Sequence, residues 1–206
     1  MASPARLVLV RHGETVWNIE QRMQGQQDSP LTAQGVAQAQ ALARRLVHFA
    51  PKLVYTSDLG RTLATARPIA EACGVPLVED RELRERHLGL FEGLTLIEIE
   101  RRHPEVWCRF RTEGQDYVVP GGESVRQRFD RSVRALTRIA RSHPGESAVV
   151  VAHAGTLDSA FRAVTGVPLD ERRSFSRAHG SLHVLEYQAE QWQLITWGDL
   201  AYLSEH

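Results

Sequence analysis

The chain has few cysteines, and those it has form no recognised pattern. Cys73 and Cys108 are the only two among 206 residues, and neither belongs to a C-x-x-C pair. Two such thiols build no disulfide framework, so we expect a reducing, cytoplasmic setting for the protein.

Long apolar runs and a net charge are also missing. The run at residues 7–10 is too short for the apolar region of a signal peptide. No stretch approaches the ~20 apolar residues of a membrane-spanning helix. The 25 basic and 25 acidic residues give a formal net charge of +0, so bulk electrostatics favour neither a nucleic-acid nor a membrane partner. Because Lys52 is the only lysine, each arginine is interpreted by its position.

The chain does contain a regular alternation of short apolar runs and helical patterns. Length and β-branched content predict buried strands at residues 7–10, 53–55 and 149–151. The alternation predicts an α/β fold with a mostly parallel sheet and helices on both faces, in a single domain spanning residues 1–206. Residues 182–185 and 192–195 predict an antiparallel hairpin at one edge. Capping-box patterns predict helix starts at Thr95 with Glu98 and at Ser124 with Gln127.

A cation and an imidazole directly follow the first predicted strand. Arg11 and His12 stand where the strand ends, and Gly13 allows a sharp turn away from it. Open α/β sheets bind ligands at this edge. An arginine fork matches phosphate oxygens, and a neutral histidine is a nitrogen nucleophile. The pair therefore indicates phosphoryl transfer, although an Arg-His pair alone is more often a solvent-facing arginine beside a histidine bonded to backbone.

Four further motifs make the indication specific. They are SDLGRT at residues 57–62, LRERHLG at 83–89 before FEG at 91–93, PGGES at 120–124 and VVVAHAG at 149–155. Together with residues 11–15, these motifs resemble, in type and order, the motifs of the histidine phosphatase superfamily, the phosphoglycerate-mutase-like proteins. The resemblance runs from about Arg6 to Tyr187, and residues 24–25 and 28–32 are similar to its small-phosphatase branch. It implies a three-layer α/β/α fold with a six-stranded mixed sheet and a helical lid over the site.

The resemblance also implies roles for four residues of the site. His12 corresponds to the nucleophile that forms a phosphohistidine intermediate. Arg11 and Arg61 correspond to the clamp that neutralises the phosphoryl oxygens. Ser57 is predicted to cap the helix that carries Arg61. His153 ends another predicted parallel strand, so it should share the phosphoryl group with His12 and stabilise its charge.

Glu85 is the predicted acid and base of the site. It aligns with the family's Leu-x-Glu-x-x-x-Gly pattern, and one carboxyl can protonate the leaving alkoxide and later deprotonate water. Glu82 is the competing candidate. Asn18, Gln24 and Ala154 are predicted substrate contacts by resemblance.

Residues 95–120 are predicted to form the helical lid. Trp107, Phe110 and Tyr117 would give it an apolar character suited to varied phosphomonoesters. Alternatively, its arginines could bind a second anionic group: Arg101, Arg102, Arg109 and Arg111. No metal or cofactor is expected, because two arginines and two histidines already supply positive charge, and His179 with His183 lack a third ligand.

Three functions are compatible with these motifs. We expect a phosphatase acting on small phosphomonoesters. The first alternative is a 2,3-bisphosphoglycerate-dependent phosphoglycerate mutase, but Leu88 and Gly155 stand where those mutases have Tyr and Asn. The second is a non-catalytic protein that binds phosphorylated ligands. The sequence names no individual substrate, and it leaves open whether the chain forms a homodimer.

Overall fold

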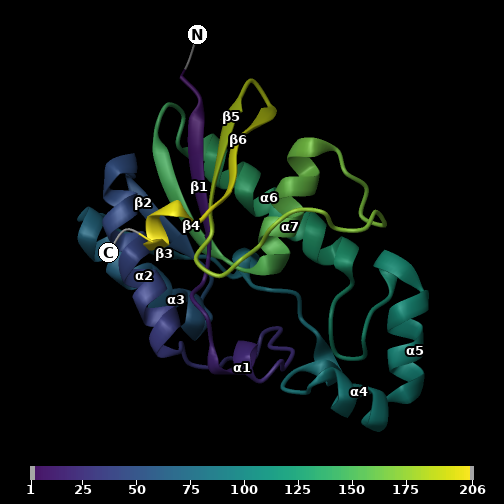
Figure 1. Cartoon of the computed structure of the whole chain (residues 1–206). Coiled ribbons are helices and arrows are strands. Elements are labelled where there is room, and N and C mark those ends of the chain that lie inside the picture. The colour runs from purple at the N-terminus through teal and green to yellow at the C-terminus, as the bar shows by residue number, and fades with distance from the viewer. Residues whose placement is uncertain (1–2, 205–206) are drawn as a thin grey trace.

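A six-stranded sheet forms the centre of the computed structural model, which describes residues 3–204 (Figure 1). Its strand order is β3-β2-β4-β1-β5-β6. The parallel strands are β1 (Ala5–Arg11), β2 (Leu53–Thr56), β3 (Leu77–Glu79) and β4 (Ser147–Ala152). The antiparallel strands are β5 (Leu182–Gln188) and β6 (Gln191–Asp199). The predicted α/β fold, its mixed sheet and its terminal hairpin are therefore confirmed.

Helices cover both faces of this sheet. The helices of the described chain are α1 (Val16–Ile19), α2 (Ala33–Leu46), α3 (Gly60–Cys73), α4 (Leu96–Arg102), α5 (Pro104–Thr112), α6 (Val125–Ser142) and α7 (Ala154–Thr165). Those that cover the sheet are α2 and α3 on one face and α6 and α7 on the other. Successive strand residues point to opposite faces, so Val8 and Val10 pack with α2 and α3, whereas Leu7 and Leu9 pack with α6 and α7. No helix in residues 3–204 has the length and apolar character needed to cross a membrane.

The register of the parallel strands positions the functional residues. Arg11 on β1 pairs with Ala152 on β4, and Val151 pairs with Thr56 on β2. The residues that follow these strands therefore emerge side by side at one sheet edge. Two of them are His12 and His153.

The segment at residues 95–120 contains helices, as predicted, and its aromatic side chains pack inside the segment. Both predicted capping boxes are present, with Thr95 at the start of α4 and Ser124 at the start of α6. The rings of Trp107 and Phe110 lie 6.1 Å and 5.3 Å from that of Phe91. They belong to a small separate core beside the sheet-bearing part of the molecule (Figure 1). The segment is therefore apolar inside, as predicted, but Trp107, Phe110 and Tyr117 do not line the cavity.

Candidate active site

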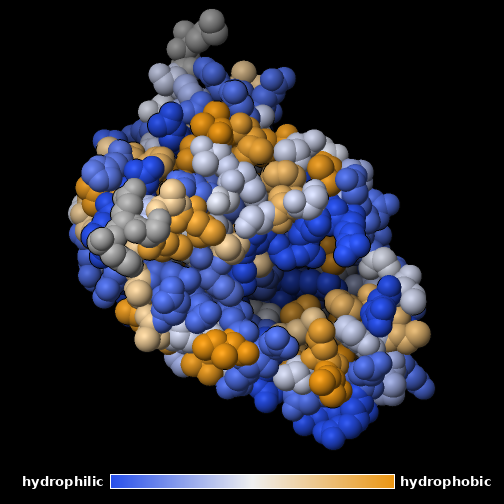
Figure 2. Space-filling view, viewed as in Figure 1, coloured by the Kyte–Doolittle hydropathy of each residue, from blue (hydrophilic) through white to orange (hydrophobic). Residues whose placement is uncertain are grey.

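A cavity of about 740 Å³ opens at the carboxyl edge of the parallel strands. It is lined by His12, Arg11, Arg61 and Glu85, which come from three separate segments of the chain. Figure 2 shows a hollow with hydrophilic walls between the sheet-bearing part and the region of α4 and α5. The structure thus brings these four predicted residues into one polar cleft.

The ring of His12 is oriented by its own backbone. Its Nδ1 lies 2.8 Å from the carbonyl oxygen of Gly13, and the residue is 3% exposed. Burial lowers its pKa well below 6.5, and the charges of Arg61, His153 and Arg11 lower it further. In the neutral ring, Nδ1 carries the proton and donates it to this carbonyl, so Nε2 keeps a free lone pair.

Gly13 is required for this arrangement by close packing. A Cβ at this position would lie 2.4 Å from the carbonyl oxygen of Gly35. The Gly13 N–H donates to the Thr65 hydroxyl at 3.0 Å. Gly35 at the start of α2 and the Thr65 side chain on α3 therefore hold the turn that presents His12.

His153 faces His12, with ring centroids 5.4 Å apart. Its Nε2 lies 2.8 Å from the Ser57 hydroxyl, and its buried Nδ1 has no hydrogen-bond partner within residues 3–204. Burial, Arg61 and Arg11 lower the pKa of His153 well below 6.5. The predicted cap role of Ser57 is wrong, because Leu59 precedes α3 without a side-chain cap and the Ser57 hydroxyl contacts His153 and Thr62 instead.

Of the two arginines of the predicted clamp, Arg61 is buried and Arg11 is half-buried, and both donate to backbone carbonyls. The Arg61 side chain is 1% exposed and donates to the carbonyls of Gly25 and Gln27, each at 2.7 Å, and to Asp28 at 3.0 Å. Arg11 donates to the Arg177 carbonyl at 2.5 Å, and burial lowers its pKa to about 10. In the described part of the chain, neither buried Nε has a hydrogen-bond partner.

Glu85 is positioned by two backbone amides. Its Oε2 accepts from Gly155 at 2.9 Å and its Oε1 from Arg86 at 2.7 Å. A Cβ on Gly155 would lie 2.0 Å from Oε1, so any larger residue there would displace this carboxylate from its observed position. The competing Glu82 lies outside the cavity lining and pairs with Arg134 at 3.1 Å and Arg138 at 2.9 Å.

Of the three uncharged residues predicted to contact substrate, two line the cavity and one does not. Asn18 and Gln24 line the cavity, and both bond to Thr15. The buried Gln24 Oε1 has no partner among the described residues. The Thr15 hydroxyl accepts from Gln24 Nε2 at 2.8 Å and donates to Asn18 Oδ1 at 2.9 Å, so it links the two amide side chains. Ala154 is outside the cavity lining, which Gly155 forms at this point.

Sequence reasoning missed most of the cavity's arginines. Those it proposed in residues 95–120 lie outside the cavity lining, to which this segment contributes Gln115. The cavity is lined instead by Arg22, Arg86, Arg128, Arg162, Arg172, Arg173 and Arg177. Three of these come from the segment between α7 and β5, which passes beside α7 (Figure 1). Because nearly all basic residues of this chain are arginine, composition could not distinguish the arginines that line the cavity from those on the outer surface.

The two other histidines considered as metal ligands, His179 and His183, lie in different surroundings. His183 lies in β5 and contacts the Ser181 hydroxyl and the Gly198 amide. The ring of His179 lies 5.8 Å from that of His12, a neighbourhood that the sequence did not indicate. Residues 3–204 contain no cluster of three His, Cys, Asp or Glu side chains that could hold a metal ion.

Buried neutral histidines make stability depend on pH. The pKa values of His12 and His153 lie well below 6.5, and burial lowers that of His183 to about 3. Unfolding lets each bind a proton near its ordinary pKa, so the unfolded state binds more protons below pH 7. We expect the free energy of unfolding to fall by about 3 kcal/mol between pH 7 and 5.5, roughly 1 kcal/mol per histidine. Urea unfolding across this range measures it, and a flat profile would contradict it.

Comparisons with known proteins agree with this geometry. Residues 7–200 match the histidine phosphatase superfamily (branch 1). The chain is 39% identical to a metal-independent phosphoserine phosphatase of Arabidopsis thaliana, over 96% of this chain and 83% of that protein. It is also 39% identical to phosphoglycerate mutase-like protein 4 of the same plant, over 98% and 88% of the two chains.

A solved structure gives the same result. The YhfR protein of Bacillus stearothermophilus superposes with a TM-score of 0.89 at 34% identity, over 97% of this chain and 99% of that one. Both the sequence and the fold therefore match along nearly the whole length. The chain belongs to the histidine phosphatase superfamily, branch 1.

Proposed function

We propose that the chain is a phosphatase that hydrolyses small phosphomonoesters through a phosphohistidine intermediate on His12. The observation that carries the proposal is the orientation of this ring. Its Nδ1 is bonded to the Gly13 carbonyl at 2.8 Å, so Nε2 is the nitrogen left for attack on phosphorus. Burial and two guanidinium groups keep the ring neutral and therefore nucleophilic.

The other residues then have complementary roles in two steps. Nε2 of His12 forms a bond to phosphorus as the bond to the alcohol oxygen breaks, and Glu85 gives that oxygen a proton. Water next attacks the phosphohistidine, Glu85 takes a proton from it, and inorganic phosphate leaves with His12 restored. Arg11, Arg61 and His153 stabilise the charge on the phosphoryl oxygens in both steps.

The mutase alternative shares this first step and differs in what accepts the phosphoryl group. The names of the relatives include both phosphoserine phosphatase and phosphoglycerate mutase-like protein. Hydrolysis is favoured by Gly155, because glycine has no side chain to supply the polar substrate contact of the asparagine that the mutases have at this position. Leu88 likewise gives no hydroxyl to the cavity that it lines. A non-catalytic binding role is disfavoured because His12 and Glu85 are both present.

Phosphate release tests the proposed function. We expect hydrolysis of p-nitrophenyl phosphate and of 3-phosphoglycerate to continue in excess EDTA, because the proposed steps use only protein groups. Isomerisation of 3-phosphoglycerate is measured in the same mixtures with added 2,3-bisphosphoglycerate. Isomerisation faster than phosphate release would indicate a mutase. Loss of hydrolysis in EDTA with recovery in magnesium would contradict the metal-independent chemistry, and binding without turnover would indicate a non-catalytic protein.

A further inference from the structure

Three guanidinium groups meet on one buried carboxylate in the cavity wall. Asp158 on α7 accepts from Arg128 at 2.9 Å, from Arg162 at 3.2 Å and from Arg173 at 3.1 Å. The side chains of Asp158, Arg128 and Arg162 are only 7%, 5% and 4% exposed. One negative charge therefore faces three positive charges, and two of the three are almost completely removed from solvent.

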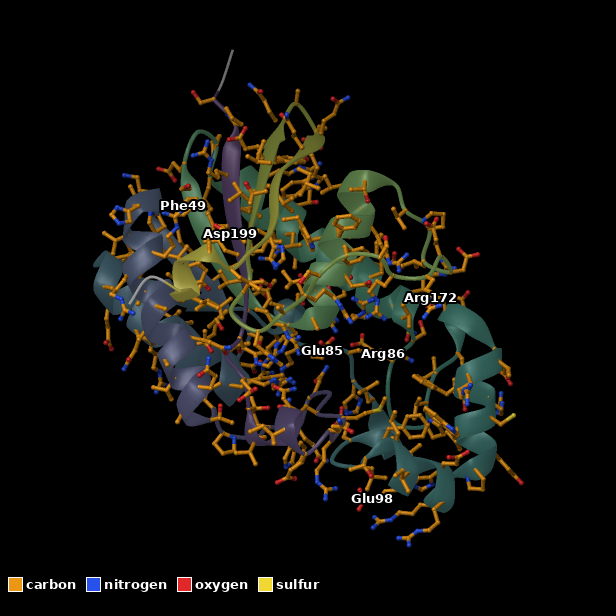
Figure 3. All side chains as sticks on the ribbon, in the orientation of Figure 1. Phe49, Glu85, Arg86, Glu98, Arg172 and Asp199 are labelled. Carbon is orange, nitrogen blue, oxygen red and sulfur yellow. The ribbon has the colours of Figure 1, made fainter. Side chains whose placement is uncertain are left out.

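Further arginines line the same cavity, together with the carboxylates of Asp170, Glu171 and Glu85. Arg86 lines the same cavity, is 9% exposed, and donates to the carbonyls of Glu123 and Tyr117 rather than to a carboxylate. Burial and the charge of Arg128 lower the pKa of Arg86 to about 10. Arg172 lines the cavity as well (Figure 3). Because uncompensated buried charge is unfavourable, this wall is suited to an anion.

The cluster lies next to the predicted acid of the reaction. Oε1 of Glu85 and Cδ of Arg128 lie 2.0 Å and 2.8 Å from the point where a Cβ on Gly155 would stand. The negative charge of Glu85 raises the pKa values of Arg11, Arg61 and Arg86 against the lowering caused by burial. Figure 3 shows Glu85, Arg86 and Arg172 around one opening. Since Glu85 would protonate the leaving oxygen, the alcohol part of the substrate extends toward this wall.

We propose that Arg128, Arg162 and Arg173, together with Arg86 and Arg172, form a second anion subsite for the alcohol part of the substrate. The inference rests on the proposed function, because it takes the phosphoryl group to bind at His12. The preferred substrates are then phosphomonoesters whose alcohol carries a carboxylate or a second phosphate. Arginine forks match both groups geometrically.

Matched substrate pairs test the subsite. 3-Phosphoglycerate and glycerol 3-phosphate differ only in a carboxylate against a hydroxymethyl group. Propane-1,3-diol bisphosphate and its monophosphate test a second phosphate in the same way. We expect kcat/KM to be about 10- to 100-fold higher for the more anionic member of at least one pair, because hydrogen bonds between charged groups are among the stronger ones. The pair with the larger ratio identifies which anion the subsite takes.

Variants locate the preference in the cavity wall. Arg173 is half-exposed, so Arg173→Gln alone or with Arg172→Gln should fold, and we expect it to lower the ratio about 5- to 10-fold. Arg128→Lys keeps the charge but loses the fork, and it should lower the ratio if it unfolds at the wild-type temperature. Arg101→Gln is the matched control, because Arg101 lies outside the cavity lining, and it should leave the ratio unchanged.

The subsite can be refuted while the proposed function stands. If p-nitrophenyl phosphate is hydrolysed but neither pair differs, the subsite is refuted and the phosphatase stands. A ratio that falls in Arg101→Gln and not in the cavity variants also refutes it. If no ester is hydrolysed, calorimetric affinities of His12→Asn for the same pairs test the subsite alone. An anionic preference there supports it, and equal affinities refute it.

Discussion

Replacement of His12 by asparagine is expected to lower kcat by about 10⁴-fold or more without unfolding the protein. The asparagine amide can still donate to the Gly13 carbonyl that holds the His12 ring, so the local hydrogen bond has a substitute. What the variant lacks is the nucleophilic nitrogen, and without it the phosphoryl group has no acceptor on the protein. Steady-state rates and circular dichroism of the two proteins measure the two parts of the expectation.

Direct labelling distinguishes this role from a purely structural one. Substrate labelled in its phosphoryl group, followed by rapid alkaline quenching, should leave label on the wild type and none on His12→Asn. His179→Asn is the matched control, because the His179 ring lies 5.8 Å from that of His12 but is assigned no chemical step. This control should keep the label. Label that persists in His12→Asn, or is found on another residue, would contradict the assignment.

Replacement of Glu85 by glutamine is expected to slow alkyl phosphates far more than p-nitrophenyl phosphate. An alkoxide needs a donated proton to leave, so we expect a loss of about 10²- to 10⁴-fold on glycerol 3-phosphate. A p-nitrophenolate leaves with little help, so its release in a single turnover, which precedes the attack of water, should slow by less than about 10-fold. The comparison uses the same enzyme preparation, so a folding defect would reduce both rates together.

Glu82→Gln is the control for this experiment. Glu82 lies three residues before Glu85 but pairs at the surface with Arg134 and Arg138. Because surface ion pairs contribute little, we expect its activity on both substrates to stay within about twofold of wild type. Equal losses on both substrates in Glu85→Gln, or a selective loss on the alkyl substrate in Glu82→Gln, would transfer the acid role away from Glu85.

Local signals in the sequence were sufficient for the architecture and for the core of the site. The runs before His12 and His153 predicted parallel strands that end at the same sheet edge, and the observed register makes these strands neighbours and places both residues there. Capping boxes at Thr95 and Ser124 correctly predicted two helix starts. These features depend on residues a few positions apart, whose steric and hydrogen-bonding preferences act within one strand or one helical turn.

Only the tertiary structure decided which side chains face the cavity. Trp107 and Phe110 pack on Phe91, whereas the sequence pattern suggested an apolar lid. Ser57 contacts His153 instead of capping α3. Arg128 and Arg173 converge on Asp158 from segments far apart in the chain.

The physical reason is that a side chain's surroundings depend on how distant elements pack, whereas its helix or strand depends mainly on its neighbours along the chain. An arginine at a helix surface has the same local pattern whether it faces water or a buried carboxylate. The sequence by itself therefore determined the α/β fold with its mostly parallel sheet, and the placement of His12 and His153 at one sheet edge. Packing between α6, α7 and the segment before β5 determined the charge of the cavity wall and, with it, the class of substrate that we propose.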